Sequence, residues 1–335
     1  MSNLESEPRE AVCGGRAEAA VEPVLELMPG REVVLGGTRG MKVTRTLPTR
    51  GRRMVGAWCF ADHYGPERVE MRVPPHPHTG LQTVSWLVEG AVLHRDSLGS
   101  EQLIRPGRLN LMTAGRGIAH SEESPRATAD GATGAGGTGD AGGTLGVLHG
   151  VQLWVALPGP DRDVAPHFEH HGDLPVLAEP GATVKVIMGE LGGAVSPARV
   201  YTPIVGAEAA LDAGARLRLP ARPDFEYALL GLSGEVEAEG ADLAPGPLLY
   251  LGAGRTSISL TARYASRVLL LGGEPFDEQI VMWWNFVGRS HDDIVRYRKE
   301  WASGEGFGTV HGFDGDPLPA PDLPSTPLKA RGRVR

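Results

Sequence analysis

Along most of this chain, apolar and polar residues follow the period of β-strands rather than that of helices. Successive side chains of a strand point to opposite faces, so a strand with one buried face is apolar at every second position. Several stretches are also rich in β-branched residues, and turn sequences such as Arg105-Pro106-Gly107 separate them. The clearest lie at 33–60, 82–88, 109–113, 151–157 and, as a longer block, 184–271. The pattern predicts an all-β protein.

Only one segment, near the C-terminus, has convincing helical periodicity. Ser290 with Asp293 three residues later makes an approximate capping box. The residues that would share one face of this helix are Ile294, Tyr297 and Trp301. After Asp316 the chain carries five prolines and then a set of basic residues, which favours an extended strap or a loose end: Lys329, Arg331, Arg333 and Arg335.

Two short motifs, His-Pro-His at 76–78 and His-Ser-Glu at 120–122, carry the candidate chemistry. Residues i and i+2 of a strand face the same side, so each motif can direct two ligands into one space. Three imidazoles and one carboxylate suit a divalent transition metal and leave positions of an octahedral ion open. We therefore predict a metal site formed by His76, His78, His120 and Glu122. Glu122 is preferred to Glu123, whose side chain should point away.

An internal repeat indicates two copies of one β module. The matching segments are Pro106-Gly107 with Pro245-Gly246, Ala114-Gly115-Arg116 with Ala253-Gly254-Arg255, and Val88-Glu89-Gly90 with Leu232-Ser233-Gly234. Carrying the offsets across places His120 and Glu122 on Ser259 and Thr261, and His76 and His78 on Pro220 and Arg222. The second copy would then have the scaffold without the ligands.

Composition narrows the class of protein. The 335 residues suit two domains, and 47 glycines and 27 prolines favour turn-rich β structure. A net charge of −8 gives no basic field for direct binding of nucleic acid or of an anionic membrane. Two cysteines, Cys13 and Cys59, cannot form a disulfide framework, so a cytoplasmic location is expected. The N-terminus does not read as a secretory signal, and no apolar run is long enough to span a membrane.

The motifs together resemble the pirin family of bicupins. The resemblance covers roughly residues 32 to 310 and rests on these segments: His76-Pro77-His78-Thr79-Gly80, Glu89-Gly90, His94-Arg95-Asp96-Ser97-Leu98-Gly99, Pro106-Gly107, the run from Met112 to Glu122, and Leu270-Leu271-Gly272-Gly273-Glu274-Pro275. It implies two tandem cupin (jelly-roll-like) β-barrels with a metal only in the N-terminal one. It also implies one Fe(II) per chain, held by His76, His78, His120 and Glu122. The chain departs from the family at Gln82 and Thr79, where pirins commonly carry Glu and often Arg.

This resemblance and the residue pattern divide the chain into four parts. We expect a flexible N-terminus at 1–30, a metal-binding barrel at 31–160 with a flexible glycine-rich loop at 126–146, a second barrel without ligands at 161–290, and a helix with a proline-rich basic tail at 291–335.

Other polar residues are weighed against structural roles. His94, two residues before Asp96, is interpreted as a turn-stabilising residue. The cluster His167, His170 and His171 is read as solvated surface in a loop. Gln82 is either a partner that orients a metal ligand or a cross-strand packing residue. The remaining two are Arg116, for which a structural role in a turn is favoured over an anion-binding one, and Cys59, a small buried hydrophobe.

Three functions are compatible with the predicted site. Pirin-like proteins include some with quercetin 2,3-dioxygenase activity, which implies a flavonol or similar small aromatic substrate, with Glu122 as the base for its hydroxyl. Others are described as nuclear transcription cofactors, which implies a metal-dependent or redox-dependent regulator that binds a protein partner. The third is a barrel that its metal only stabilises. The ligands alone would also accept Mn, Co, Ni, Cu or Zn.

Overall fold

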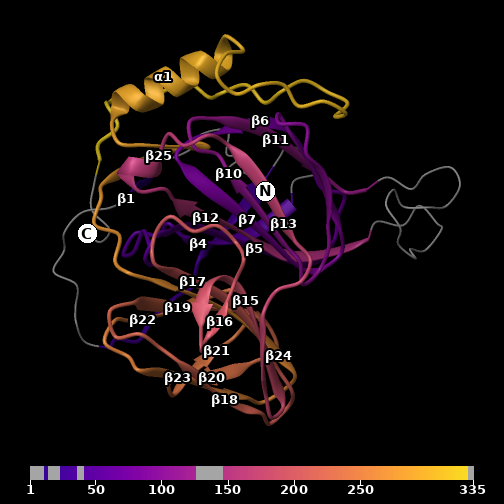
Figure 1. The fold of residues 1–335 in the computed structure, drawn as a ribbon, viewed down its shortest axis with the longest axis vertical. Coiled ribbons are helices and arrows are strands. Elements are labelled where there is room, and N and C mark those ends of the chain that lie inside the picture. Colours follow the sequence, from indigo (N-terminus) through magenta and orange to yellow (C-terminus); the bar gives the residue numbers. More distant parts are fainter. Residues whose placement is uncertain (1–10, 14–22, 36–40, 126–145, 331–335) are drawn as a thin grey trace, which may run out of the picture.

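The computed structural model describes residues 11–13, 23–35, 41–125 and 146–330, and these form two stacked β-barrels (Figure 1). The strands of the N-terminal barrel are β3 (Arg31–Leu35), β4 (Met41–Leu47), β5 (Trp58–Arg68), β6 (Arg72–His78), β7 (Leu81–Glu89), β8 (Val92–Asp96), β9 (Glu101–Ile104), β10 (Leu109–Thr113), β11 (Ile118–Glu123), β12 (Val147–Ala156) and β13 (His167–His171). They pair in two sheets, in the orders β13-β10-β7-β12-β5-β4-β3 and β6-β11-β8-β9.

The C-terminal barrel repeats this plan. Its strands are β2 (Glu26–Met28), β14 (Val176–Glu179), β15 (Ala182–Leu191), β16 (Ala194–Val195), β17 (Ile204–Leu211), β18 (Arg216–Pro220), β19 (Glu226–Ser233), β20 (Val236–Ala238), β21 (Ala241–Leu243), β22 (Leu248–Gly252), β23 (Ser257–Ala262) and β24 (Ser266–Gly273). They pair in the orders β14-β15-β17-β24-β19-β22-β2, with β16 beside β15, and β18-β23-β20-β21. The two predicted barrels are confirmed.

Two strands cross the divisions suggested by the sequence. Strand β13, placed in the second part, pairs with β10 and extends the N-terminal sheet. Strand β2, placed in the flexible N-terminus, pairs with β22 of the C-terminal barrel and buries Met28. The prediction of a flexible segment is therefore wrong for residues 26–28, because the free edge of β22 supplies main-chain hydrogen-bond partners. The predicted loop at 126–146 lies, except for Gly146, outside the described residues.

A small sheet and the single helix complete the chain. They comprise β1 (Ala11–Cys13), β25 (Ile280–Trp283), β26 (Phe286–Gly288) and α1 (His291–Ala302), and a 3-10 turn lies at Gly159–Asp161. Strand β1 pairs with β25, so residues 11–13 also depart from the expected flexibility. The capping box is present, because Ser290 accepts from Asp293 N and the Asp293 carboxylate accepts from Ser290 N. In the described residues no helix is both long and apolar enough to cross a membrane.

The segment after α1 lies against the N-terminal barrel as an extended strap. Leu318 N donates to Pro75 O, and Ala119 N donates to Phe307 O, so the strap is bonded to β6 and β11. Figure 1 shows α1 and this segment across the end of the barrel where those two strands lie. The strap interpretation is confirmed as far as residue 330.

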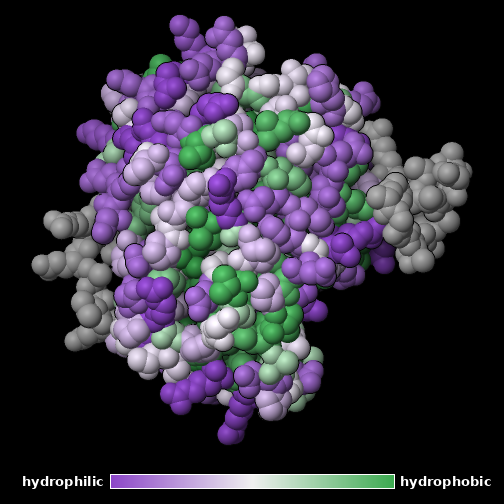
Figure 2. Space-filling model, in the orientation of Figure 1, coloured by the Kyte–Doolittle hydropathy of each residue, from purple (hydrophilic) through white to green (hydrophobic). Residues whose placement is uncertain are grey.

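The barrels share one apolar core between their large sheets. Trp58 is fully buried, and its Nε1 lies 3.2 Å from both Val205 O and Gly272 O of the C-terminal barrel. A Cβ on Gly206 would come within 3.0 Å of the Trp58 ring, so the close contact depends on glycine there. Most of the face in Figure 2 is hydrophilic, and the exposed apolar residues gather mainly over the C-terminal barrel.

An ion pair is buried in the N-terminal barrel. Arg45 and Asp62 are 2% and 0% exposed and form two hydrogen bonds, of 2.7 and 2.8 Å. The Arg45 guanidinium also lies over the Phe60 ring at 4.4 Å. Removing one partner of a buried pair leaves an uncompensated charge in a medium of low dielectric constant.

We therefore expect Asp62→Ala to lower the free energy of unfolding by about 3–5 kcal/mol. Thermal unfolding followed by circular dichroism measures this effect. The control is Glu32→Ala, since Glu32 pairs with Lys42 at an exposed site and its loss should cost less than about 1 kcal/mol. Equal effects of the two changes would contradict the account of this ion pair.

Candidate metal centre

Strands β6 and β11 bring three histidines together inside the N-terminal barrel. His76 pairs with His120 and His78 with Ile118 across the ladder. Strand β6 contains three prolines and lies at the edge of its sheet, which is where a strand tolerates residues without N–H groups. His76, His78 and His120 are each no more than 1% exposed.

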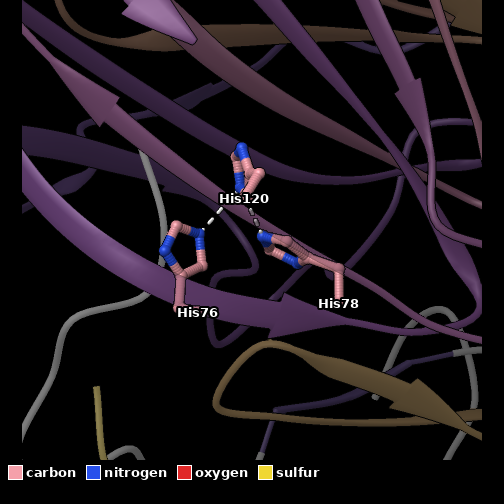
Figure 3. Close-up of side chains that lie close together, drawn as sticks. All are labelled: His76, His78 and His120. Carbon is pink, nitrogen blue, oxygen red and sulfur yellow. Dashed lines mark hydrogen bonds between the residues drawn. The ribbon is translucent and has the colours of Figure 1, made fainter. Parts of the chain in front are cut away.

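The Nε2 atoms of the three rings converge. His120 Nε2 lies 2.7 Å from His76 Nε2 and 3.1 Å from His78 Nε2, and Figure 3 shows the rings facing a common point. Nitrogen ligands about 2.1 Å from one ion, at right angles to each other, are roughly 3.0 Å apart. The spacing therefore fits adjacent positions around an octahedral ion. These three histidines form a group that can hold a metal.

Main-chain carbonyls fix the other nitrogen of two rings. His76 Nδ1 donates to Pro74 O at 2.8 Å, and His78 Nδ1 donates to Asn285 O at 3.1 Å. A neutral imidazole carries one N–H, so each of these Nε2 atoms keeps its lone pair, as in metal-ligating histidines. Asn285 follows Trp284, which has a left-handed backbone with φ 53°, in the two-residue turn between β25 and β26. A strained turn thus presents the carbonyl to His78.

Burial keeps these histidines neutral. It lowers the pKa of His76 to about 4, and it lowers the pKa of His78 and of His120 well below 6.5, with the neighbouring histidines acting in the same direction. Neutral rings do not have to lose a proton before binding a metal.

Glu122 belongs to a second group of possible ligands, which shares His120 with the first. Its side chain is 2% exposed, and it lies with His94 and His120 in a group whose ligand atoms are within 4.8 Å of one another. Ser85 Oγ is 3.3 Å from Glu122 Oε1 and 3.0 Å from Gln152 Oε1. Glu123 instead forms an ion pair with Arg95. The structure thus places Glu122, and not Glu123, at the centre.

His94, which the sequence indicated to be a turn-stabilising residue, lies beside His120. His94 Nδ1 lies 3.3 Å from His120 Nδ1, and its Nε2 lies 3.3 Å from Asp96 Oδ2. Asp96 Oδ1 does stabilise the turn, accepting from the main-chain N–H groups of Leu98 and Ser100. The i+2 spacing of His94 and Asp96 was a usable signal, but the nearness of His94 to His120 depends on the pairing of β8 with β11.

Gln82 forms its side-chain hydrogen bonds away from the four predicted ligands. Its Nε2 donates to Thr113 Oγ1 and to Arg199 O, which matches cross-strand packing, the alternative to a role beside the metal. Gln82 and Ser85 are three residues apart on β7, so their side chains point to opposite faces of the strand. Ser85 is the one that contacts Glu122, and Ser85 and Gln152 therefore occupy the position beside the ligands that was expected for Gln82.

The remaining candidates lie away from the centre. His167 and His171 are in strand β13 rather than a loop, half-buried, and both contact Glu169; this is a correction to the predicted solvated loop. His170 bonds to Asn110. Arg116 is exposed in its turn, with its N–H donating to Val164 O. Cys59 is fully buried, as predicted, and burial raises its pKa to about 12.

The C-terminal barrel has no such group among the described residues. The residues equated with His120 and Glu122 by the repeat, Ser259 and Thr261, are not on its inner face. Ile258, Leu260 and Ala262 face inward there and pack in an apolar core. The offset is one residue out of phase, and such a slip exchanges the two faces of a strand. The conclusion that this barrel lacks the ligands stands.

Comparisons with known proteins agree with this architecture. The family model described as Pirin matches residues 40–155, and the Pirin C-terminal cupin domain matches residues 206–308. The chain belongs to the pirin family. A relative from Pseudomonas aeruginosa, named "Putative quercetin 2,3-dioxygenase PA1205", is 45% identical over 90% of this chain and 92% of its own. A pirin-like protein of Caulobacter vibrioides is 37% identical over 78% of this chain and 88% of its own.

One solved structure is similar over nearly the whole pirin fold. It is the quercetin 2,3-dioxygenase from Acinetobacter baumannii, with a TM-score of 0.81 and 39% identity, covering 91% of this chain and 97% of that one. The tandem cupin arrangement is therefore common to both proteins.

We expect His120→Ala to abolish metal retention, because His120 Nε2 lies 2.7 and 3.1 Å from the Nε2 atoms of His76 and His78. The measurement is metal content by mass spectrometry after Fe(II) loading and gel filtration. His167→Ala is the control, since His167 contacts Glu169 on β13 and should leave the content unchanged. Equal retention in the two variants would refute the site.

The metal-free protein should lose stability as pH falls from about 6.5 to about 4. Over this interval the unfolded chain binds protons that buried His76, with its pKa lowered to about 4, does not. A shift of this size corresponds to roughly 3 kcal/mol for a fully buried ring. Urea unfolding across this pH range measures the slope, and His76→Gln should make it shallower. A slope unchanged in that variant would be inconsistent with neutral His76.

Proposed function

We propose that this pirin is a metal-dependent dioxygenase of the quercetin 2,3-dioxygenase type, acting on a flavonol or a similar aromatic with an enol hydroxyl. The observation that carries the proposal is the convergence of three neutral Nε2 atoms beside a buried carboxylate. The relatives named for this activity support it, above all the 39% identical enzyme with the same fold.

His76, His78 and His120 would hold the metal, with Glu122 as the fourth ligand and Fe(II) as the ion. When bound, the metal would supply Lewis-acid and redox chemistry for the reaction with O₂. Because Nδ1 of His76 and of His78 is bonded to a carbonyl, these rings present Nε2 without rotating.

Glu122 would act as the base for the substrate hydroxyl. Ser85 has one hydroxyl proton and two nearby acceptors, Glu122 Oε1 and Gln152 Oε1. When Glu122 takes up a proton, that proton can be donated to Ser85 Oγ while the Ser85 hydroxyl turns to Gln152. Glu122 can therefore change protonation state without losing a hydrogen-bond partner, which would otherwise be costly for a buried group.

Oxygen consumption tests this proposal. After anaerobic loading with Fe(II), adding quercetin in oxygenated buffer should give uptake equal to the quercetin consumed, and Glu122→Gln should reduce it at least 100-fold, the lower range for a lost acid–base group. The control is Glu123→Gln on the same strand, whose carboxylate pairs with Arg95. No uptake by protein with one bound iron would reject the enzyme and favour a metal-dependent regulator with a protein partner.

A further inference from the structure

Apart from the three histidines of the metal centre, two further histidines lie together outside the interior of the N-terminal barrel. His63 on β5 and His149 on β12 are 6% and 3% exposed, and their Nε2 atoms are 2.9 Å apart. This spacing falls between the 2.7 and 3.1 Å separations found in the metal centre. Either one shared proton or one shared cation can join two nitrogens at this distance.

The pair faces the junction between the two barrels. The main-chain carbonyl of Leu232, on β19 of the C-terminal barrel, lies near the His149 ring and favours its protonated form. A neutral imidazole has a single N–H, so one of the two nitrogens of each ring carries a lone pair that can bind a proton or a cation.

A carboxylate is available on the next strand. Strand β12 lies between β5 and β7 in the sheet, and Glu89 of β7 is directly opposite His149. Residues directly opposite across a ladder have Cβ atoms about 5 Å apart. Glu89 is exposed and its carboxylate stands outside 4.8 Å of the pair, so it must rotate to join them. Glu208 adds negative charge nearby but is engaged by Trp86 and Arg267.

Burial keeps both rings neutral and able to bind a cation. Burial, with the nearby His149, lowers the pKa of His63 to about 4. Burial also lowers the pKa of His149, although the charge of Glu89 opposes this shift. Neutral imidazoles are suitable ligands for divalent cations of intermediate softness.

We propose that His63, His149 and Glu89 form a second metal site, at the junction of the barrels, for an ion such as Zn²⁺, Ni²⁺ or Cu²⁺. Three adjacent strands supply two imidazoles and one carboxylate, which leaves further positions of the ion to water. Because Leu232, Arg267 and Glu208 of the C-terminal barrel lie near His149, an ion here would also stabilise the contact between the barrels.

Zinc stoichiometry tests the site in the full chain. After equilibrium dialysis against Zn²⁺, we expect two ions per chain in the unchanged protein and one in His63→Gln. Glu89→Ala, at an exposed position, should weaken binding of the second ion. The control is His171→Ala, which removes the contact with Glu169 on β13 and should leave two ions.

One ion in the unchanged protein, or two in His63→Gln, would overturn the proposal. Loss of the second ion in His171→Ala would place it on β13 instead. Unchanged zinc affinity in Glu89→Ala would remove the carboxylate and with it the three-residue site.

Discussion

The interior of the N-terminal barrel buries three imidazole nitrogens whose lone pairs need a partner. Three imidazole Nε2 atoms meet in its interior, at 2.7 and 3.1 Å around His120, where water cannot solvate them. Only one or two protons can be shared among three such nitrogens. Burial opposes further protonation, because it disfavours the charged form of each ring. A single cation can bind all three lone pairs at once. Carbonyls of Pro74 and Asn285 hold two of the rings in this arrangement.

The second barrel shows what the same scaffold does without those three imidazoles. Its inward residues on β18 and β23 are apolar, and they fill the interior with aliphatic side chains. The two barrels nevertheless depend on each other. Trp58 of one donates into the carbonyls of the other, and β2 and β13 each pair with the barrel that lies outside their own part of the sequence. The turn at Trp284 reaches back from beyond the second barrel to orient a histidine of the first. Chemistry in one barrel is thus supported by a chain segment that follows the other.

Much of this arrangement could be predicted from the sequence, because it is local. Alternation predicted strands, Ser290 predicted the helix start, and the i+2 spacing predicted that His76 and His78 share a face. What failed depends on pairing between distant strands. The position of His94 follows from the register of β8 with β11. The position of Gln82 depends on which face of β7 is turned toward the barrel interior once β7 pairs with β12. The repeat offset was read one residue out of phase, which a sequence comparison cannot detect because it does not show which face is buried.

The central claim is that three imidazoles inside the N-terminal barrel bind one metal. X-ray absorption spectroscopy of protein loaded with a single equivalent of Fe(II) tests it directly, because imidazole rings give a characteristic multiple-scattering pattern. The account predicts three imidazoles at about 2.1 Å, together with oxygen ligands. A spectrum with two imidazoles or fewer would contradict it.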